Sequence, residues 1–146
     1  MRTIALGLLT TLGTSAALAQ SVADTGRARL TIDQCVNAFD PSKVESTAVG
    51  YQYWFVDRNF LDGRTVKMSV VRPGGATHAP HRHPEDETFF VLEGKAEFFL
   101  DGQKRTAGPY TSFYCPPNSL HGIRNAGADV LKYLVLKKDP KADPRQ

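Results

Sequence analysis

The chain has few of the residues that build disulfide-stapled, redox or nucleic-acid-binding proteins. Two of its 146 residues are cysteine, and they form no Cys-x-x-Cys pair, which argues against a thioredoxin-like motif or a cysteine-ligated zinc site. Its 18 basic and 15 acidic side chains leave a net charge of only +3. No segment concentrates basic residues with interleaved aromatic ones, so we expect no nucleic-acid partner.

The two cysteines are Cys35 and Cys115. In an oxidising compartment they could form a disulfide, which would close a loop of about 80 residues and stabilise the fold by roughly 4 kcal/mol in the chain-entropy model. The alternative is a pair of buried thiols. The sequence leaves both readings open, because it does not show how close the two Cα atoms come.

Long apolar runs are also absent, with one exception at the N-terminus. Arg2 precedes residues 4–18, which are apolar or small throughout, and Ala17-Leu18-Ala19 is a small-x-small cleavage pattern. We predict a signal peptide over residues 1–19, cleaved after Ala19, and therefore a secreted or periplasmic protein without stable membrane association after cleavage. The alternatives are an uncleaved anchor and a buried N-terminal helix.

The rest of the chain is predicted to form one domain with short extensions. Residues 20–49 read as an N-terminal arm, in which Thr31 and Gln34 form a capping-box pattern. A short helix through Cys35 and Phe39 would follow and stop at Pro41. Residues 50–137 are predicted to be the β domain, and residues 138–146 a flexible C-terminal tail.

After residue 50 the sequence has the pattern of an all-β protein. Short β-rich runs alternate with turn signals, and Asp101-Gly102 is a typical hairpin turn. This spacing is typical of an antiparallel sandwich or barrel. The predicted strands are residues 51–56, 66–71, 88–92, 96–100, 112–115 and 131–136.

Three of the four histidines fall within six residues, and acidic residues follow them. His81 and His83 are two apart, so on a strand they point to the same face. Glu87 then leads the next predicted strand, so its carboxylate can converge on the two imidazoles. Imidazole nitrogens and carboxylate oxygens are the usual ligands of a borderline divalent metal. The alternative is a solvated histidine-rich loop.

The wider pattern resembles the two conserved motifs of the cupin family. Gly75, five residues, His81-x-His83, three residues, Glu87, six residues and Gly94 match the first motif position for position. The second motif is matched at its proline, histidine and asparagine, here Pro116, His121 and Asn125. Two positions depart from it, because Asn118 and Tyr110 stand where cupins have glycine. Asn118 can preserve the turn, since asparagine tolerates a left-handed conformation; Tyr110 puts the local loop in question.

The resemblance implies a jelly-roll barrel preceded by a short helical or irregular segment. It implies that His81, His83, Glu87 and His121 bind one divalent transition metal: iron, manganese, nickel, copper or zinc. Glu87 is the candidate catalytic residue, either as fourth ligand or as a general base. The resemblance also implies a homodimer, with residues 21–49 as the exchanged arm.

The expected partner is a small-molecule substrate. Tyr53, Phe89 and Phe113 are candidates for the substrate wall, although most such aromatic residues are ordinary core. Arg124 is a candidate for pairing with an anionic substrate, against the alternative of a solvent-facing arginine, and His78 is expected at the rim.

The favoured function is a metal-dependent dioxygenase. The first alternative is a metal-assisted isomerase, lyase or decarboxylase of a sugar acid or small carboxylic acid, and the second is a non-catalytic binder of a metal or small ligand. The sequence does not separate these hypotheses, because one scaffold serves many chemistries.

Overall fold

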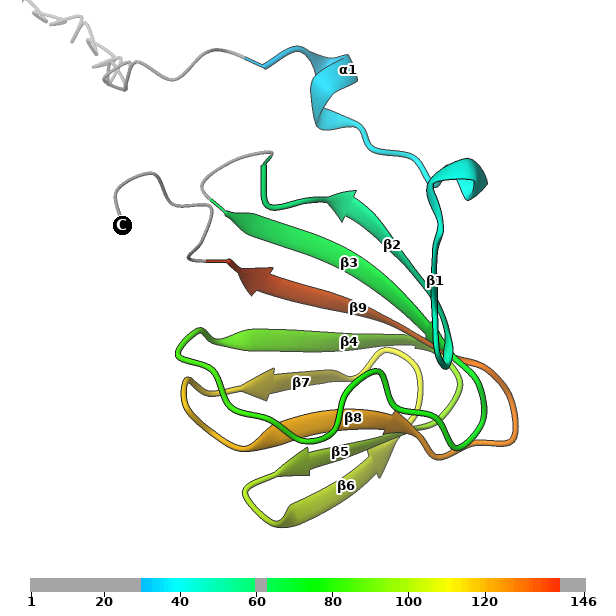
Figure 1. Ribbon diagram of the computed structural model, residues 1–146, viewed down its shortest axis with the longest axis vertical. Coiled ribbons are helices and arrows are strands. Elements are labelled where there is room, and N and C mark those ends of the chain that lie inside the picture. The colour runs from blue at the N-terminus through cyan, green and yellow to red at the C-terminus, as the bar shows by residue number, and fades with distance from the viewer. Residues whose placement is uncertain (1–29, 60–62, 140–146) are drawn as a thin grey trace, which may run out of the picture. The chain divides into compact units, whose positions relative to one another are not determined.

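The computed structural model describes residues 30–59 and 63–139. The chain divides into two units, residues 1–31 and 32–146, and the fold below is that of the second unit (Figure 1). The predicted signal peptide and most of the predicted tail lie outside the described residues. Within the described residues, no helix is long and apolar enough to cross a membrane.

The predicted all-β architecture is confirmed. The larger sheet has the strand order β1-β2-β3-β9-β4-β7, and the smaller one has the order β6-β5-β8. All paired strands are antiparallel. The strands are β1 (Glu45–Thr47), β2 (Gly50–Val56), β3 (Arg64–Val71), β4 (Glu87–Glu93), β5 (Ala96–Leu100), β6 (Gln103–Ala107), β7 (Ser112–Cys115), β8 (His121–Asn125) and β9 (Leu131–Lys138).

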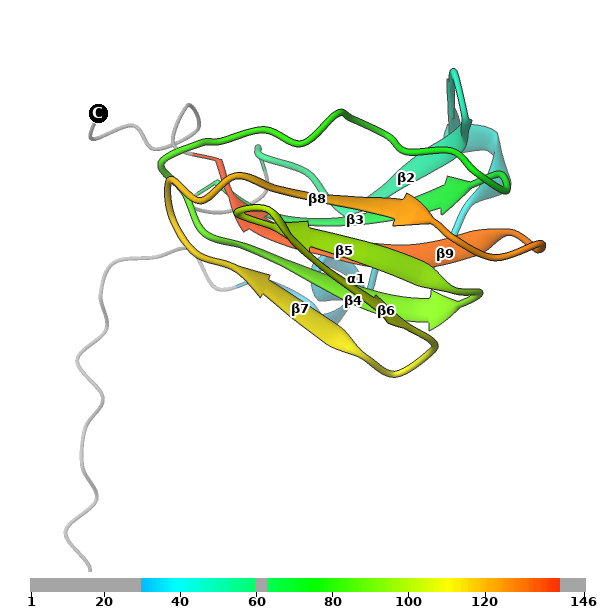
Figure 2. The ribbon, with the colours of Figure 1, turned by 90° about the horizontal axis from the view of Figure 1, so that it is seen from below.

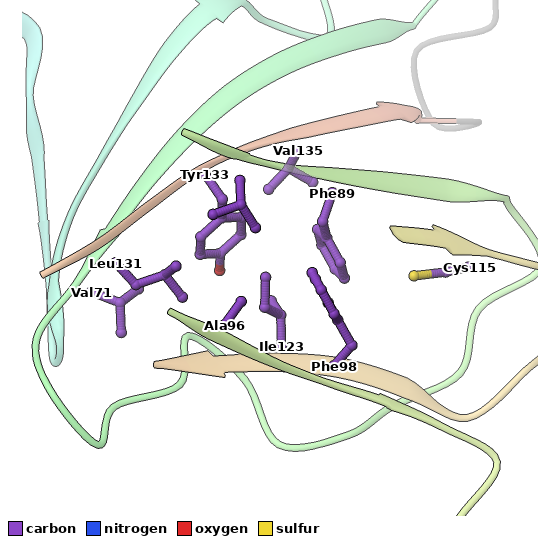
Figure 3. Close-up of a cluster of buried hydrophobic side chains, with 10 residues drawn as sticks. Val71, Phe89, Ala96, Phe98, Cys115, Ile123, Leu131, Tyr133 and Val135 are labelled. Atoms are coloured by element: carbon purple, nitrogen blue, oxygen red, sulfur yellow. The ribbon is translucent and has the colours of Figure 1, made fainter. Parts of the chain in front are cut away.

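The main core fills the space between the two sheets. In the view of Figure 2, β5 and β8 overlie the larger sheet. Figure 3 shows the apolar side chains that meet between the two sheets. Leu131, Tyr133 and Val135 alternate inward along β9, as a half-buried strand requires. The buried cluster also holds Val71, Phe89, Val91, Ala96, Phe98, Cys115 and Ile123.

A second apolar cluster lies on the opposite face of the larger sheet. Tyr53, Met68 and Val70 form its buried centre. The Tyr53 hydroxyl donates to the Ala38 carbonyl at 2.9 Å, and its ring contacts Phe39 with a centroid separation of 4.8 Å. The N-terminal arm is therefore packed on this outer face of the sheet.

The helix predicted in that arm is shorter than expected. It spans only α1 (Ile32–Cys35), and a 3₁₀ turn, η1 (Pro41–Lys43), follows. Asp40 caps this turn by accepting a hydrogen bond from the Ser42 amide at 3.0 Å. The structure does not support the disulfide hypothesis, because both cysteines are free thiols. Cys35 is exposed and Cys115 is buried.

Three turns contain a residue other than glycine in the left-handed conformation. Asp101 and Gly102 have φ of 44° and 89°, which gives the hairpin predicted between β5 and β6. Asn118 has φ of 61°, so it does replace the usual glycine in the second motif. Tyr110, the other departure, also adopts a positive φ of 61°. Gly94 cannot be replaced so easily, since an added Cβ would lie 2.4 Å from the Val130 carbonyl oxygen.

Candidate metal centre

The two motifs meet through the backbone at one end of the barrel. His81 and His121 form an isolated antiparallel bridge, with both N–H···O distances at 3.0 Å. The Asn118 amide donates to the His83 carbonyl at 2.8 Å. These bonds hold the loop that carries His81 and His83 against the start of β8, although 35 residues or more separate the partners in sequence.

Glu87 reaches the same place from the larger sheet. It is the first residue of β4, and its side chain shares the inner face with Phe89 and Val91. The structure brings together all four ligand candidates from the sequence, His81, His83, Glu87 and His121. One ligand atom from each lies within 4.8 Å of the other three. Glu87 and His121 are buried, with 8% and 0% exposure.

Each of the three rings is oriented by a backbone carbonyl. The Nδ1 atoms of His81, His83 and His121 lie 3.0, 2.9 and 2.9 Å from the carbonyl oxygens of residues 79, 85 and 119. A carbonyl can only accept, so a neutral ring must carry its proton on Nδ1. The unshared pair of each Nε2 is thereby left free for a metal, which is the usual arrangement around metal-binding histidines.

The inner ends of these rings need a cation or a proton between them and the carboxylate. His121 Nε2 lies 3.2 Å from Glu87 Oε2, and His83 Nε2 lies 3.7 Å from the same oxygen. His83 Nε2 is buried and has no hydrogen-bond partner among the described residues. Burial and the charge of Lys137 lower the pKa of His83, which favours its neutral, metal-binding form. The donor set and geometry therefore fit a divalent metal.

A cavity of about 170 Å³ opens beside the cluster. On a liquid-water scale it has room for about five or six water-sized groups, so it suits a small ligand. Its apolar part includes Phe89, Ile123 and Val135. The polar part includes His81 and Glu87 of the cluster. It also includes Thr77 and Tyr133, whose hydroxyl groups lie 3.1 Å apart. Burial raises the pKa of Tyr133, so its hydroxyl stays protonated.

The structure sorts the substrate-wall candidates into two groups. Phe89 and the rim candidate His78 both line the cavity. Tyr53 does not, because it lies in the outer cluster beneath the N-terminal arm. Phe113 packs against Phe98 with ring centroids 4.8 Å apart, outside the cavity lining. Arg124 is exposed and paired with Glu97, its Nε donating at 2.7 Å, so the solvent-facing alternative describes its place.

Sequence reasoning missed several residues that line the cavity. Trp54, Lys67 and Lys137 face it, together with Tyr133 and Thr77. Trp54 follows Tyr53 on β2 and therefore points to the opposite face of the sheet, which is the cavity side. One signal was available for Lys67, because polar residues alternate with apolar ones along the segment that forms β3.

Comparisons with known proteins agree with this fold. Residues 67–137 match the Cupin_2 family model, described as a cupin domain. The chain is 29% identical over 76 residues to the dimethylsulfoniopropionate lyase DddQ of Ruegeria pomeroyi, which covers 51% of this chain and 38% of the relative. It is 32% identical over 79 residues to an uncharacterized protein of Methanocaldococcus jannaschii, covering 51% and 63%. The chain thus spans less than two thirds of either curated relative.

A solved structure extends the likeness over more of the chain. The Cupin 2 conserved barrel domain protein of Salinispora arenicola superposes with a TM-score of 0.60 at 20% identity, and the match covers 75% of this chain and 92% of that one. At this identity the likeness concerns the fold alone. It confirms the predicted jelly-roll barrel.

Proposed function

We propose that this chain, a protein with the cupin fold, is a metal-dependent enzyme that cleaves a bond in a small oxygen-bearing substrate. His81, His83, Glu87 and His121 would hold one divalent transition metal. The observation that carries the proposal is the orientation of the three rings, whose Nδ1 atoms all face backbone carbonyls while the orphaned Nε2 of His83 faces Glu87.

The residues around the cluster have distinct parts in such a reaction. A bound metal would polarise a substrate oxygen as a Lewis acid. Glu87 can accept a proton at Oε2, the oxygen that faces His83 and His121. The Tyr133 hydroxyl, kept protonated by burial, can donate a hydrogen bond to the substrate. Phe89 and Val135 supply an apolar wall beside that place.

Cleavage without net oxidation, as in a lyase or decarboxylase, is the reaction class that we favour over the dioxygenase. The support is the similarity to a relative whose name is that of a lyase. The dioxygenase hypothesis stays a prediction. Oxygen consumption separates the two, because only the oxidative reaction requires oxygen.

The test is a matched pair of carboxylate-to-amide substitutions on one strand. Glu87 and Glu93 are the first and last residues of β4, and Glu93 is exposed and paired with Lys132 at 2.7 Å. Metal content of the full chain is measured by mass spectrometry, and turnover is screened on small carboxylic acids with and without oxygen. We expect one metal per chain, and we expect Glu87→Gln to lower kcat by about 100-fold or more while Glu93→Gln leaves it unchanged.

Two outcomes would contradict this proposal. The first is a purified protein that takes up no divalent metal. The second is a Glu87→Gln variant as active as the Glu93→Gln control, since the carboxylate at the centre of the histidine cluster would then have no part in the chemistry.

We also propose that the protein is exported and that it dimerises through its arm. Export is supported by the apolar run over residues 4–18. Dimerisation is supported by large apolar side chains that the arm exposes, Ile32 at 73% and Val36 at 64%. Sequencing of the N-terminus of the expressed protein tests cleavage after Ala19. Light scattering tests the dimer, which an Ile32→Ser, Val36→Ser variant should dissociate.

A further inference from the structure

Two lysines face the cavity from neighbouring strands of the larger sheet. Lys67 comes from β3 and Lys137 from β9, and both line the cavity. In the strand register, Lys137 lies between Thr65 on one side and Glu87 on the other, while Lys67 stands opposite Val135, two residues before Lys137. The two side chains therefore stand on the same inner face, diagonal to each other across the β3–β9 pair.

Neither lysine has a carboxylate partner in the part of the chain that the structure describes. The carboxylate of Glu87 faces the histidines, and that of Asp139 lies 3.2 Å from Arg58. Lys67 Nζ lies instead 5.1 Å from the centre of the Trp54 ring, which holds it by a cation–π contact. Lys67 is only partly exposed, and burial lowers its pKa.

Lysines that face outward on the same barrel behave differently. Lys132, five residues before Lys137 on β9, is paired with Glu93 at 2.7 Å. Lys104 on β6 is paired with Glu97 at 3.3 Å. Glu87 lies opposite Lys137 in the strand register, and its charge acts on Lys67, so it sets one negative charge against two partly buried ammonium groups. A further anion would relieve this imbalance. Both ammonium groups border the space beside the candidate metal centre.

We propose that Lys67 and Lys137 form an anion-binding element and that the substrate is a small carboxylate bearing a second oxygen. This inference rests on the proposed function, because the second oxygen would face the cluster of His81, His83, Glu87 and His121. The carboxylate would accept hydrogen bonds from the two ammonium groups, which are point-like donors. A cavity of about 170 Å³ leaves room for only a few further heavy atoms.

The experiment compares a charged probe with its neutral isostere on the full chain loaded with Mn²⁺. Glycolate carries a carboxylate and a hydroxyl, and glycolamide has nearly the same shape without the charge. Affinities are measured by calorimetry for wild type, Lys67→Met, Lys137→Met and the control Lys132→Met. Metal content is measured for each variant. Inorganic phosphate is titrated as a third probe.

We expect glycolate to bind wild type and the control at least 10-fold more tightly than glycolamide does. Either inner substitution should weaken glycolate binding by about 10-fold or more, the loss expected for one charge-assisted hydrogen bond, with metal content unchanged. Glycolamide binding should not change among the variants.

Several results would overturn the inference while leaving the metal centre intact. One is a normally metallated protein that binds glycolate no better than glycolamide. Others are phosphate binding as tight as glycolate binding, or equal losses in Lys132→Met and the inner variants. A protein that takes up no Mn²⁺ would instead overturn the proposed function. The difference in affinity between glycolate and glycolamide could then still be measured on the metal-free protein, where it would test the two lysines alone.

Discussion

Metal binding should raise the thermal stability of the barrel by an amount that can be worked out beforehand. The four ligand atoms already lie within 4.8 Å of one another, and three backbone carbonyls fix the rings, so binding requires no folding of the site. The core on which the fold depends lies between the sheets and contains none of the four ligands. The metal-free protein should therefore stay folded. The increase in its free energy of unfolding when metal is added should equal the free energy contributed by metal binding alone.

At a free metal concentration 100 times the dissociation constant, that term is about 2.7 kcal/mol. For a domain of about 100 residues, each kcal/mol raises Tm by roughly 4–8 °C, so the expected shift is about 10 °C or more. If loss of one ligand weakens binding about 100-fold, the same metal concentration gives only RT ln 2, about 0.4 kcal/mol, or roughly 2–3 °C.

Two histidine substitutions make a matched test of this reasoning. His83 belongs to the ligand set, whereas His78 lines the cavity with its ring centroid 5.6 Å from that of His81 but is not in the set. Calorimetric melting is recorded with chelator and with metal for wild type, His83→Asn and His78→Asn. The shift should survive in His78→Asn and nearly vanish in His83→Asn. Equal losses in both variants, or no shift in wild type, would refute the assignment of the ligands.

Three further predictions concern residues that are not among the four proposed ligands. Burial raises the pKa of Cys115 to about 12, so in a variant lacking the other cysteine Ellman's reagent should label no thiol at pH 8 until the protein is unfolded. Gly94→Ala should cost about 2–4 kcal/mol in urea unfolding, because its Cβ meets backbone, whereas Gly102→Ala, with a positive φ but open space, should cost about 1 kcal/mol. Hydrogen bonding to Arg124 holds the pKa of Glu97 at about 2. The ion pair therefore stabilises the fold fully above pH 4.5, and this stabilisation is lost as the pH falls toward 2. In Arg124→Gln, NMR should show a Glu97 pKa closer to 4.5, with turnover unchanged.

The sequence predicted the strands whose apolar residues alternate, and missed those that lack this signal. The segments predicted as 96–100 and 112–115 are β5 and β7 to the residue. Strand β6 was missed because its sequence, Gln-Lys-Arg-Thr-Ala, is nearly all exposed at the edge of the small sheet. Strand β8 was missed because two of its five residues, His121 and Asn125, are polar residues of the second cupin motif and hide the pattern of a strand.

The ligand set could be predicted, whereas the substrate wall could not, for a physical reason. Metal ligands are few, chemically distinctive and fixed in spacing, so His81, His83, Glu87 and His121 stand out in the sequence. Aromatic residues serve equally on either face of a sheet. Tyr53 packs outward because the N-terminal arm covers that face, and the long-range contact with the arm leaves no local trace in the sequence.

The inner face of β3 gives the strongest argument that the cavity is built for a ligand. Along this strand the outward residues Met68 and Val70 are apolar, whereas the inward ones near the cluster are Thr65 and Lys67. A barrel selected for stability alone would bury apolar side chains there, since partial burial of an ammonium group lowers stability. Departures from local packing rules are expected where function requires them. The reversal is confined to the part of the strand beside the metal candidates, because farther along it Val71 joins the main core.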